Sequence, residues 1–303
     1  MDADYPLMTN KDKPFKDVVI VGCGDIGKRV AKIWKNTGKT VHAVTRSTGN
    51  LEQLKEQQLR AYQLDLDNIN EKELPPCQDA LLYYFAPPPR QGIQDTRITN
   101  FLKKLDTSRL PNRIVYISTS GVYGDQQGKL IDETTPANPQ VERAKRRYFA
   151  EHALTQWAQT HHVLLTLLRV GGIYGPGRLP LQRLKDHIPM LHENLSPQTN
   201  RIHADDLAQV CVAAAIQKTA KEIYNVSDGT NSNMTEYFNT IADFVGLPRP
   251  PLVGWDEAEK TISKGMLSYL NESRKMDNSK MINNLKITLQ YPTLKDGLKN
   301  CLD

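Results

Sequence analysis

Glycines at the spacing Gly-x-Gly-x-x-Gly, from Gly22 to Gly27, are the first residues of this sequence that point to a chemistry. The β-branched run Asp17–Val21 before them predicts a buried strand, and the apolar spacing after them predicts a helix. In such a turn the first glycine permits the bend, the second lets backbone N–H groups approach a pyrophosphate, and the third lets helix and strand pack closely. The helix N-terminus adds partial positive charge. The residues predicted to contact a dinucleotide are Gly22, Gly24, Asp25, Ile26 and Gly27.

The end of the second predicted strand bears on which dinucleotide binds. An acidic residue usually stands there to accept the ribose 2′-hydroxyl of NAD, but this sequence has Arg46 and Ser47 after the strand at residues 40–45. A guanidinium with an adjacent hydroxyl suits a 2′-phosphate, which an acid would repel. The sequence therefore favours NADP(H), with NAD(H) as the alternative, and predicts that Arg46 and Ser47 contact the cofactor.

Strand-like and helix-like segments alternate along most of the chain. The runs typical of strands are residues 17–21, 40–45, 60–64, 80–85, 113–118, 163–169 and 222–226. This alternation predicts an α/β fold, a doubly wound parallel sheet of the Rossmann type with a smaller C-terminal substrate lobe. We expect residues 14–173, completed by residues 201–226, to form the dinucleotide-binding domain. Residues 174–200 and 227–303 are expected to form the small lobe.

Several further motifs follow the glycine segment in order. They are residues 65–66 (DL), 116–124 (YISTSGVYG), Arg169, 174–177 (YGPG), 201–208 (RIHADDLA) and 224–226 (YNV). Together they resemble the short-chain dehydrogenase/reductases, in particular an atypical extended type similar to the NAD(P)-dependent epimerase/dehydratase family. The resemblance implies that Asp65 and Leu66 contact the adenine and that Ile173 lies at the nicotinamide end. Ala86 and Pro87, after the fourth strand, are also expected to contact the cofactor.

The catalytic set of this family is a Ser or Thr after the fifth strand and a Tyr-x-x-x-Lys on the next helix. Residues four apart share a helix face, so the ammonium lowers the pKa of the phenol while the hydroxyl orients the substrate oxygen. By resemblance Thr119 takes the hydroxyl position. Lys145 is the predicted lysine, with catalytic and cofactor-binding roles, on a long helix expected to begin near Asn138. Val141, however, stands four residues before Lys145.

A second register of the same helix remains open. Anchored on Glu151, it places Arg143 and Arg147 at the tyrosine and lysine positions, so neither register supplies the phenol. Another phenol takes its place, or Lys145 or an arginine stabilises a developing oxyanion, or the protein binds its cofactor without turning it over. The candidate phenols are Tyr123, Tyr148 and Tyr174.

The leading hypothesis is an NAD(P)-dependent oxidoreductase or nucleotide-sugar epimerase/dehydratase-like enzyme. Such an enzyme transfers hydride to or from a sugar-type alcohol or carbonyl. The alternative is a cofactor-binding sensor or regulatory protein that lacks the active-site tyrosine. An enzyme would change the absorbance of reduced cofactor with some carbonyl substrate, and a sensor would not.

Composition excludes several other classes of protein. The chain has 303 residues, 39% hydrophobic and 24% charged, and its net charge of +5 is too diffuse to predict nucleic-acid binding. Its four cysteines form no CxxC pair and no metal-ligand spacing, so we expect free thiols and no metal site.

Residues 1–16 lack the apolar core of a signal peptide, and no apolar run approaches the ~20 residues that cross a bilayer. We therefore expect a cytoplasmic protein with a small-molecule substrate and no membrane or nucleic-acid partner. Helices around Phe101 and Tyr148 are candidates for a homodimer interface.

Overall fold

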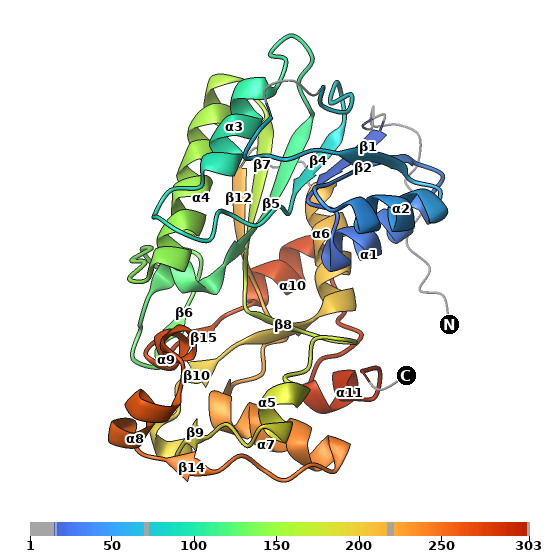
Figure 1. Ribbon diagram of the computed structural model, residues 1–303. Helices are drawn as coiled ribbons and strands as arrows, with labels where there is room; N and C mark the ends of the chain where they lie inside the picture. The colour runs from blue at the N-terminus through green and yellow to red at the C-terminus, as the bar shows by residue number, and fades with distance from the viewer. Residues whose placement is uncertain (1–14, 16, 70–72, 217–220, 302–303) are drawn as a thin grey trace.

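A parallel sheet of seven strands forms the centre of the computed structural model, which describes residues 15, 17–69, 73–216 and 221–301 (Figure 1). The strand order is β12-β7-β5-β4-β1-β2-β3. The bounds are β1 Asp17–Val21, β2 Thr40–Thr45, β3 Arg60–Gln63, β4 Leu81–Tyr84, β5 Arg113–Thr119, β7 Leu164–Val170 and β12 Lys221–Val226. The chain winds outward from β1 to β3 and then returns to β4, on the other side of β1. The predicted doubly wound fold is confirmed, with a topological switch point between β1 and β4.

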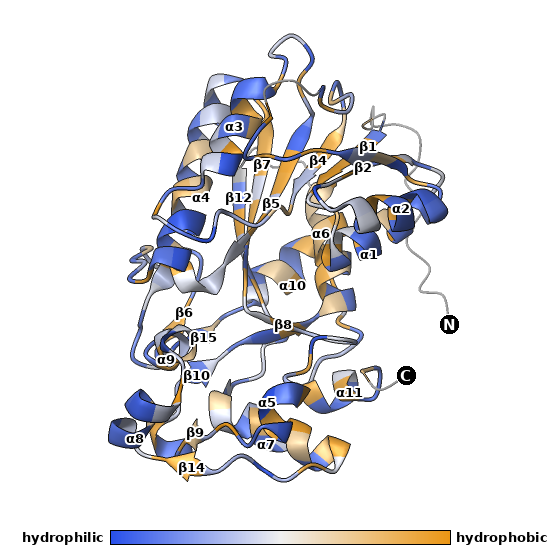
Figure 2. Ribbon diagram, viewed as in Figure 1, coloured by the Kyte–Doolittle hydropathy of each residue, from blue (hydrophilic) through white to orange (hydrophobic). Residues whose placement is uncertain are grey.

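Both faces of the sheet are apolar and covered by helices. Strand β1 shows the reason, because Val18 and Ile20 enter one core while Val19 and Val21 enter the other. The first face is covered by α1 (Asp25–Asn36), α2 (Thr48–Glu56), α6 (Ala204–Ala215) and α10 (Ser279–Leu285). The second is covered by α3 (Thr96–Lys104) and α4 (Glu142–Thr160). Figure 2 shows the hydrophobic colour gathered on the strands and on α6.

A smaller lobe lies beyond the carboxyl ends of the strands (Figure 1). Strands β8 (Gly172–Tyr174) and β11 (Arg201–His203) pair in parallel at its boundary with the sheet. Its own core includes Leu184, Phe238 and Ile241. The other elements outside the sheet are α5 Leu181–Lys185, β9 Met190–Leu191, β10 Gln198–Thr199, β13 Ser232–Asn233, α7 Met234–Val245, β14 Leu252–Val253, α8 Trp255–Thr261, α9 Lys264–Leu270, α11 Leu294–Leu298, and β6 Leu130–Ile131, which pairs with β15 Lys275–Met276.

Helix α10 departs from the predicted division of the chain. Its residues belong by sequence to the predicted small lobe, but Met281 and Leu285 pack in the sheet core against β12 and α6. Their apolar side chains cover strand β12, which lies at the edge of the sheet.

In the ranges that the structure describes, no helix is both long and apolar enough to span a membrane. Most of residues 1–16 lie outside these ranges.

Two details near α4 also differ from expectation. The helix begins at Glu142 rather than near Asn138, because the backbone N–H of Asn138 donates to Val122 O at 2.9 Å and ties this segment to the 3₁₀ turn Ser120–Tyr123. Phe101 is fully buried against Tyr84. The Phe101 side chain therefore belongs to the core, and a dimer interface on the helices around Phe101 and Tyr148 stays a prediction.

A buried ion pair joins α4 to the middle of the sheet. Glu151 accepts hydrogen bonds from Arg169 of β7, with Nη2–Oε2 at 2.7 Å and Nε–Oε1 at 3.2 Å. Ser118 of β5 donates its hydroxyl to the same Oε1 at 2.5 Å. All three side chains are buried. Since Arg147 precedes Glu151 by one turn and Thr119 follows Ser118, this contact positions two candidate site residues.

We expect Glu151→Gln to lower the free energy of unfolding by about 3–5 kcal/mol, because the substitution leaves Arg169 buried without a counter-charge. Glu142→Gln is the matched control on the same helix. Glu142 is 67% exposed and lies 3.6 Å from Arg146, so its loss is expected to cost less than about 1 kcal/mol. Chemical denaturation measures both values. Similar small losses for the two variants would contradict the role given to the buried pair.

Candidate functional site

The glycine segment forms a tight turn between β1 and α1. Gly22 has a φ of +86°, and a Cβ there would lie 2.3 Å from Ala86 N, so only glycine fits. Gly24 faces open space. Lys28 N donates to Gly24 O at 2.8 Å to close the first turn of α1, and no side chain caps this helix. The amide N–H groups of residues 25–27, which come before Lys28 in the helix, therefore remain for a ligand.

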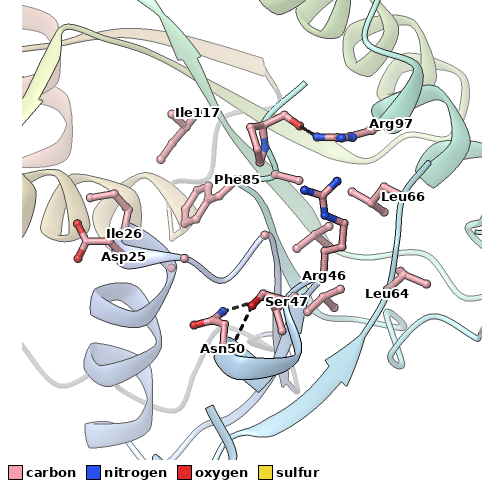
Figure 3. A pocket seen from close by; sticks show the side chains of 18 of the residues that line it. Asp25, Ile26, Arg46, Ser47, Asn50, Leu64, Leu66, Phe85, Arg97 and Ile117 are labelled. Carbon is pink, nitrogen blue, oxygen red and sulfur yellow. Dashed lines mark hydrogen bonds between the residues drawn. The ribbon is translucent and has the colours of Figure 1, made fainter. Parts of the chain in front are cut away.

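A cavity of about 510 Å³ opens beside this turn, at the carboxyl ends of β1, β2 and β4 (Figure 3). Every residue predicted to contact the cofactor lines it, except Lys145. These residues are Gly22, Gly24, Asp25, Ile26, Gly27, Arg46, Ser47, Asp65, Leu66, Ala86, Pro87 and Ile173. They come together because parallel strands place their carboxyl ends at one edge of the sheet.

Asn50, which sequence reasoning missed, ties α2 to the glycine turn. Its Nδ2 donates to Cys23 O at 2.9 Å and to Thr45 Oγ1 at 3.0 Å. Its backbone N–H donates to Ser47 Oγ at 3.3 Å, which caps α2 (Figure 3). Ser47 is a recognisable cap residue in the sequence, but nothing local to Asn50 signals its contact with Cys23.

Two arginines, Arg46 after β2 and Arg97 of α3, approach the carboxylate of Asp67, which follows β3. Arg97 holds Asp67 through two hydrogen bonds of 2.8 and 2.7 Å, and this pairing lowers the pKa of Asp67. Arg46 lies 3.7 Å from the same carboxylate and its side chain is 65% exposed. Arg46 is therefore loosely held and free to turn toward an anion in the cavity, whereas Arg97 is engaged.

Arg178, which follows β8, reaches from the lobe to the glycine turn. Its Nε donates to Asp25 Oδ2 at 2.5 Å, and Arg29 Nε donates to Asp25 Oδ1 at 2.9 Å. Burial opposes ionisation of Asp25, but these two hydrogen bonds lower its pKa overall. Arg29 also pairs with Asp205 at the start of α6. The glycine turn is thus linked by charge to the lobe and to α6.

A second cavity of about 600 Å³ continues from the first. The two share four lining residues, Ile117, Arg147, Ile173 and Arg178. The second is bounded by the end of β5, by α4, and by residues of β8, β11, α7 and α9. A molecule in one cavity can therefore meet a molecule in the other at this shared wall.

Helix α4 turns Arg143 and Arg147 toward the second cavity. Arg147 Nη1 donates to Ile117 O at 3.1 Å and to the Tyr116 hydroxyl at 3.3 Å. Lys145 is exposed and lines neither cavity. Since successive residues of a helix are turned by about 100°, a residue two positions from both arginines points away from them. The predicted placement of Lys145 at the cofactor is therefore corrected, and the register anchored on Glu151 is the one that the fold adopts.

Thr119, the residue predicted to supply the catalytic hydroxyl, lines the second cavity, and its Oγ1 accepts from Gly121 N at 3.2 Å. The three candidate phenols lie elsewhere. Tyr123 donates to Asn225 Oδ1 at 2.7 Å, Tyr174 donates to Thr293 O at 3.2 Å, and Tyr148 packs on His152. None of the three lines either cavity. The tyrosines that line the second cavity are Tyr237 and Tyr269.

Asp228, just after β12, is a buried carboxyl beside the second cavity. Its backbone N–H donates to Arg201 O at 2.6 Å, and its Oδ1 accepts from Thr230 N and Oγ1 at 2.8 and 2.7 Å. Burial raises the pKa of Asp228 to about 6, and the hydrogen bonds from Thr230 only partly offset this effect.

A doubly wound parallel sheet with a glycine turn at its switch point defines a Rossmann-type protein. Residues 94–227 match the model of the NAD dependent epimerase/dehydratase family. The chain is therefore similar to this family over that segment, and the family resemblance predicted from its motifs is confirmed there.

Relatives span nearly the whole chain. Protein YeeZ of Escherichia coli K12 is 24% identical over 284 residues, which cover 91% of this chain and 97% of YeeZ. The solved structure of a functionally unknown conserved protein from Silicibacter pomeroyi has a TM-score of 0.81 at 26% identity, covering 94% and 97% of the two chains. The UDP-glucuronic acid 4-epimerase of Bacillus cereus, solved with UDP-glucuronic acid and NAD, has a TM-score of 0.73 at 18% identity over 94% and 97%. At that identity the likeness concerns the fold alone.

The raised pKa of Asp228 predicts a pH effect on stability. The native carboxyl keeps its proton where the unfolded chain, with a pKa of 3.8, has lost it. Its contribution is therefore fully present below 3.8 and is lost as the pH rises through about 6. We expect Asp228→Asn to remove this decline, so that the variant gains stability relative to the wild type across that interval.

Unfolding free energies measured across this pH range test the effect. Asp243→Asn is the control, because Asp243 is an exposed carboxylate paired with Arg249. Parallel stability curves for the wild type and Asp228→Asn would contradict the assignment.

Proposed function

We propose that this protein is an NAD(P)-dependent oxidoreductase that acts on a carbonyl or alcohol of a nucleotide sugar without the usual tyrosine. The observation that carries this proposal is the shared wall of the two cavities, where Arg147 lies between the glycine-turn side and Thr119. The similar fold of the Bacillus cereus epimerase, which holds UDP-glucuronic acid together with NAD, supports the same pair of ligands.

The residues of the first cavity fit an adenine dinucleotide. Gly24 leaves room for a diphosphate beside the uncapped N-terminus of α1. Leu64 and Leu66 add apolar surface that suits a flat base. When bound, a nicotinamide dinucleotide supplies or accepts a hydride.

Arg147 is a cation that stands at the lysine position of the family's pattern, in the register anchored on Glu151. Burial opposes its charge, but Tyr116 and Asp95 raise the pKa of Arg147, so it remains a guanidinium. An arginine does not release a proton at physiological pH and cannot act as a general base. It can stabilise the negative charge that develops on a carbonyl oxygen during reduction, while the Thr119 hydroxyl donates a hydrogen bond and water supplies the final proton.

Arg147→Met and Thr119→Ala are each expected to lower kcat by about 10²–10³-fold, because each removes a group that stabilises the oxyanion. Thr119 does not line the first cavity, so Thr119→Ala is expected to keep the dinucleotide affinity of the wild type. Lys145→Met, on the exposed side of the same helix, is the control and is expected to keep wild-type turnover. The loss of reduced-cofactor absorbance with UDP-sugar carbonyl substrates measures the turnover of all three variants. Wild-type rates in the first two variants, or a large loss in the third, would remove this assignment.

NADP(H) is proposed as the preferred cofactor, on the basis of the exposed guanidinium of Arg46 beside Ser47. We expect Arg46→Met to weaken NADP(H) binding on the order of tenfold or more, since a charged hydrogen bond is lost, and to leave NAD(H) binding unchanged. Arg60→Met is the control, because Arg60 is an exposed arginine of β3 outside the cavity. Calorimetric titration of both cofactors into the wild type and the two variants measures the six affinities. Tighter NAD(H) binding by the wild type, or an equal effect on both cofactors, would reject NADP(H) preference.

A cofactor-binding sensor is the second candidate function. Arg143 favours it, since this side chain stands at the tyrosine position and cannot exchange a proton. Tight dinucleotide binding without turnover of any carbonyl substrate would select the sensor over the enzyme.

A further inference from the structure

The second cavity is unusually rich in positive charge. Its lining contains five arginines and one acidic residue, Glu272. Arg274 Nη1 lies 3.1 Å from Glu272 Oε2, and Arg143 Nη2 lies 3.8 Å from the same oxygen. Arg178 pairs with Asp25, and Arg147 serves the reacting oxygen in the proposed function. The arginine left without a role is Arg201.

Arg201 is a buried cation whose direct contacts are with uncharged groups, while the charge of the nearby buried carboxyl Asp228 also acts on it. Its side chain is 6% exposed, Nη1 donates to Ser232 Oγ at 3.0 Å, and Nη2 contacts Met234 Sδ at 3.7 Å. The guanidinium carbon lies 3.7 Å from the ring centroid of Tyr237. Within the described residues no carboxylate forms an ion pair with Arg201, and the nearby Asp228 binds Thr230 instead. Burial lowers the pKa of Arg201 to about 10 although the charge of Asp228 partly offsets this effect, so an anionic ligand in direct contact would stabilise the guanidinium further.

The strand that carries Arg201 runs beside the strand that contributes to the shared wall of the two cavities. Strand β11 pairs with β8 so that Arg201 lies opposite Gly172, and the next pair joins Ile202 to Ile173. Ile173 lines both cavities. Arg201 itself lines the second cavity only and its guanidinium lies against Tyr237, so an anion that it holds lies in the second cavity.

We propose that the substrate carries a carboxylate that binds Arg201, so that the protein acts on an acidic sugar nucleotide in preference to a neutral one. This inference rests on the proposed function. A guanidinium suits a carboxylate because two parallel N–H donors match its two oxygens, and water is largely excluded at this site. Met234 and Tyr237 supply the apolar surface on which a sugar ring packs.

The test compares two probes that differ in one group. UDP-glucuronic acid carries a carboxylate where UDP-glucose carries a hydroxymethyl group, and each is titrated calorimetrically into the full chain saturated with its preferred dinucleotide. We expect the wild type to bind UDP-glucuronic acid on the order of tenfold more tightly. Arg201→Met should abolish this preference, and Arg201→Lys, which keeps the charge without the planar fork, should retain part of it.

Arg183→Met is the matched control in the same lobe. Arg183 is another arginine without a carboxylate partner among the described residues; it contacts Met190 Sδ at 4.0 Å and lies 5.6 Å from the ring centroid of Phe238. It lines neither cavity. We expect this variant to keep the full preference. Thermal unfolding gives a second readout, because loss of an unpaired buried cation is not expected to lower the Tm of Arg201→Met.

The outcomes separate the inference from the function on which it rests. Equal binding of the two probes by the wild type would overturn the carboxylate assignment alone. A loss in Arg201→Met that is the same for both probes would also overturn it, since Arg201 would then bind the phosphates common to both. Binding of neither probe would overturn the nucleotide-sugar proposal itself. A preference that is lost only in Arg201→Met would support the inference.

Discussion

The buried contact of Glu151 with Arg169 and Ser118 is the constraint on which the site depends. One carboxylate takes hydrogen bonds from a guanidinium on β7 and a hydroxyl on β5, so a rotated α4 would leave a buried charge unpaired. No side chain caps the N-terminus of α4, so the register of this helix is set from its middle. Arg147, one turn earlier, and Thr119, one residue beyond Ser118, consequently face the same space.

The same constraint explains why the site is electrostatic rather than acid–base in character. The helix face that carries a tyrosine and a lysine in the family's pattern carries two arginines here, and the phenols near it in sequence are engaged elsewhere. Arginine holds its charge at any pH that the protein tolerates. Such groups can bind anions and stabilise developing negative charge, and the tyrosines that line the second cavity, Tyr237 and Tyr269, come from the lobe and not from α4.

Charge also organises the boundary between the two cavities. Arg178 spans from the lobe to Asp25 on the glycine turn, and Arg29 connects the same carboxylate to α6. These contacts join segments far apart in the sequence around the place where a diphosphate is proposed to lie. The glycine turn provides backbone donors, and the arginines provide the surrounding field.

Local sequence predicted the sheet, the glycine turn and most of the residues that line the first cavity, because strand periodicity, glycine spacing and strand ends are short-range properties. Residues such as Gly22, Arg46 and Leu66 line the first cavity for this reason. Only the tertiary structure decided which face of α4 meets the cavity, since Lys145 and Arg147 are equally compatible with a helix and the choice depends on a partner at Arg169. Asn50, Arg97 and Arg178 joined the site in the same way, through contacts across the fold that no local pattern encodes.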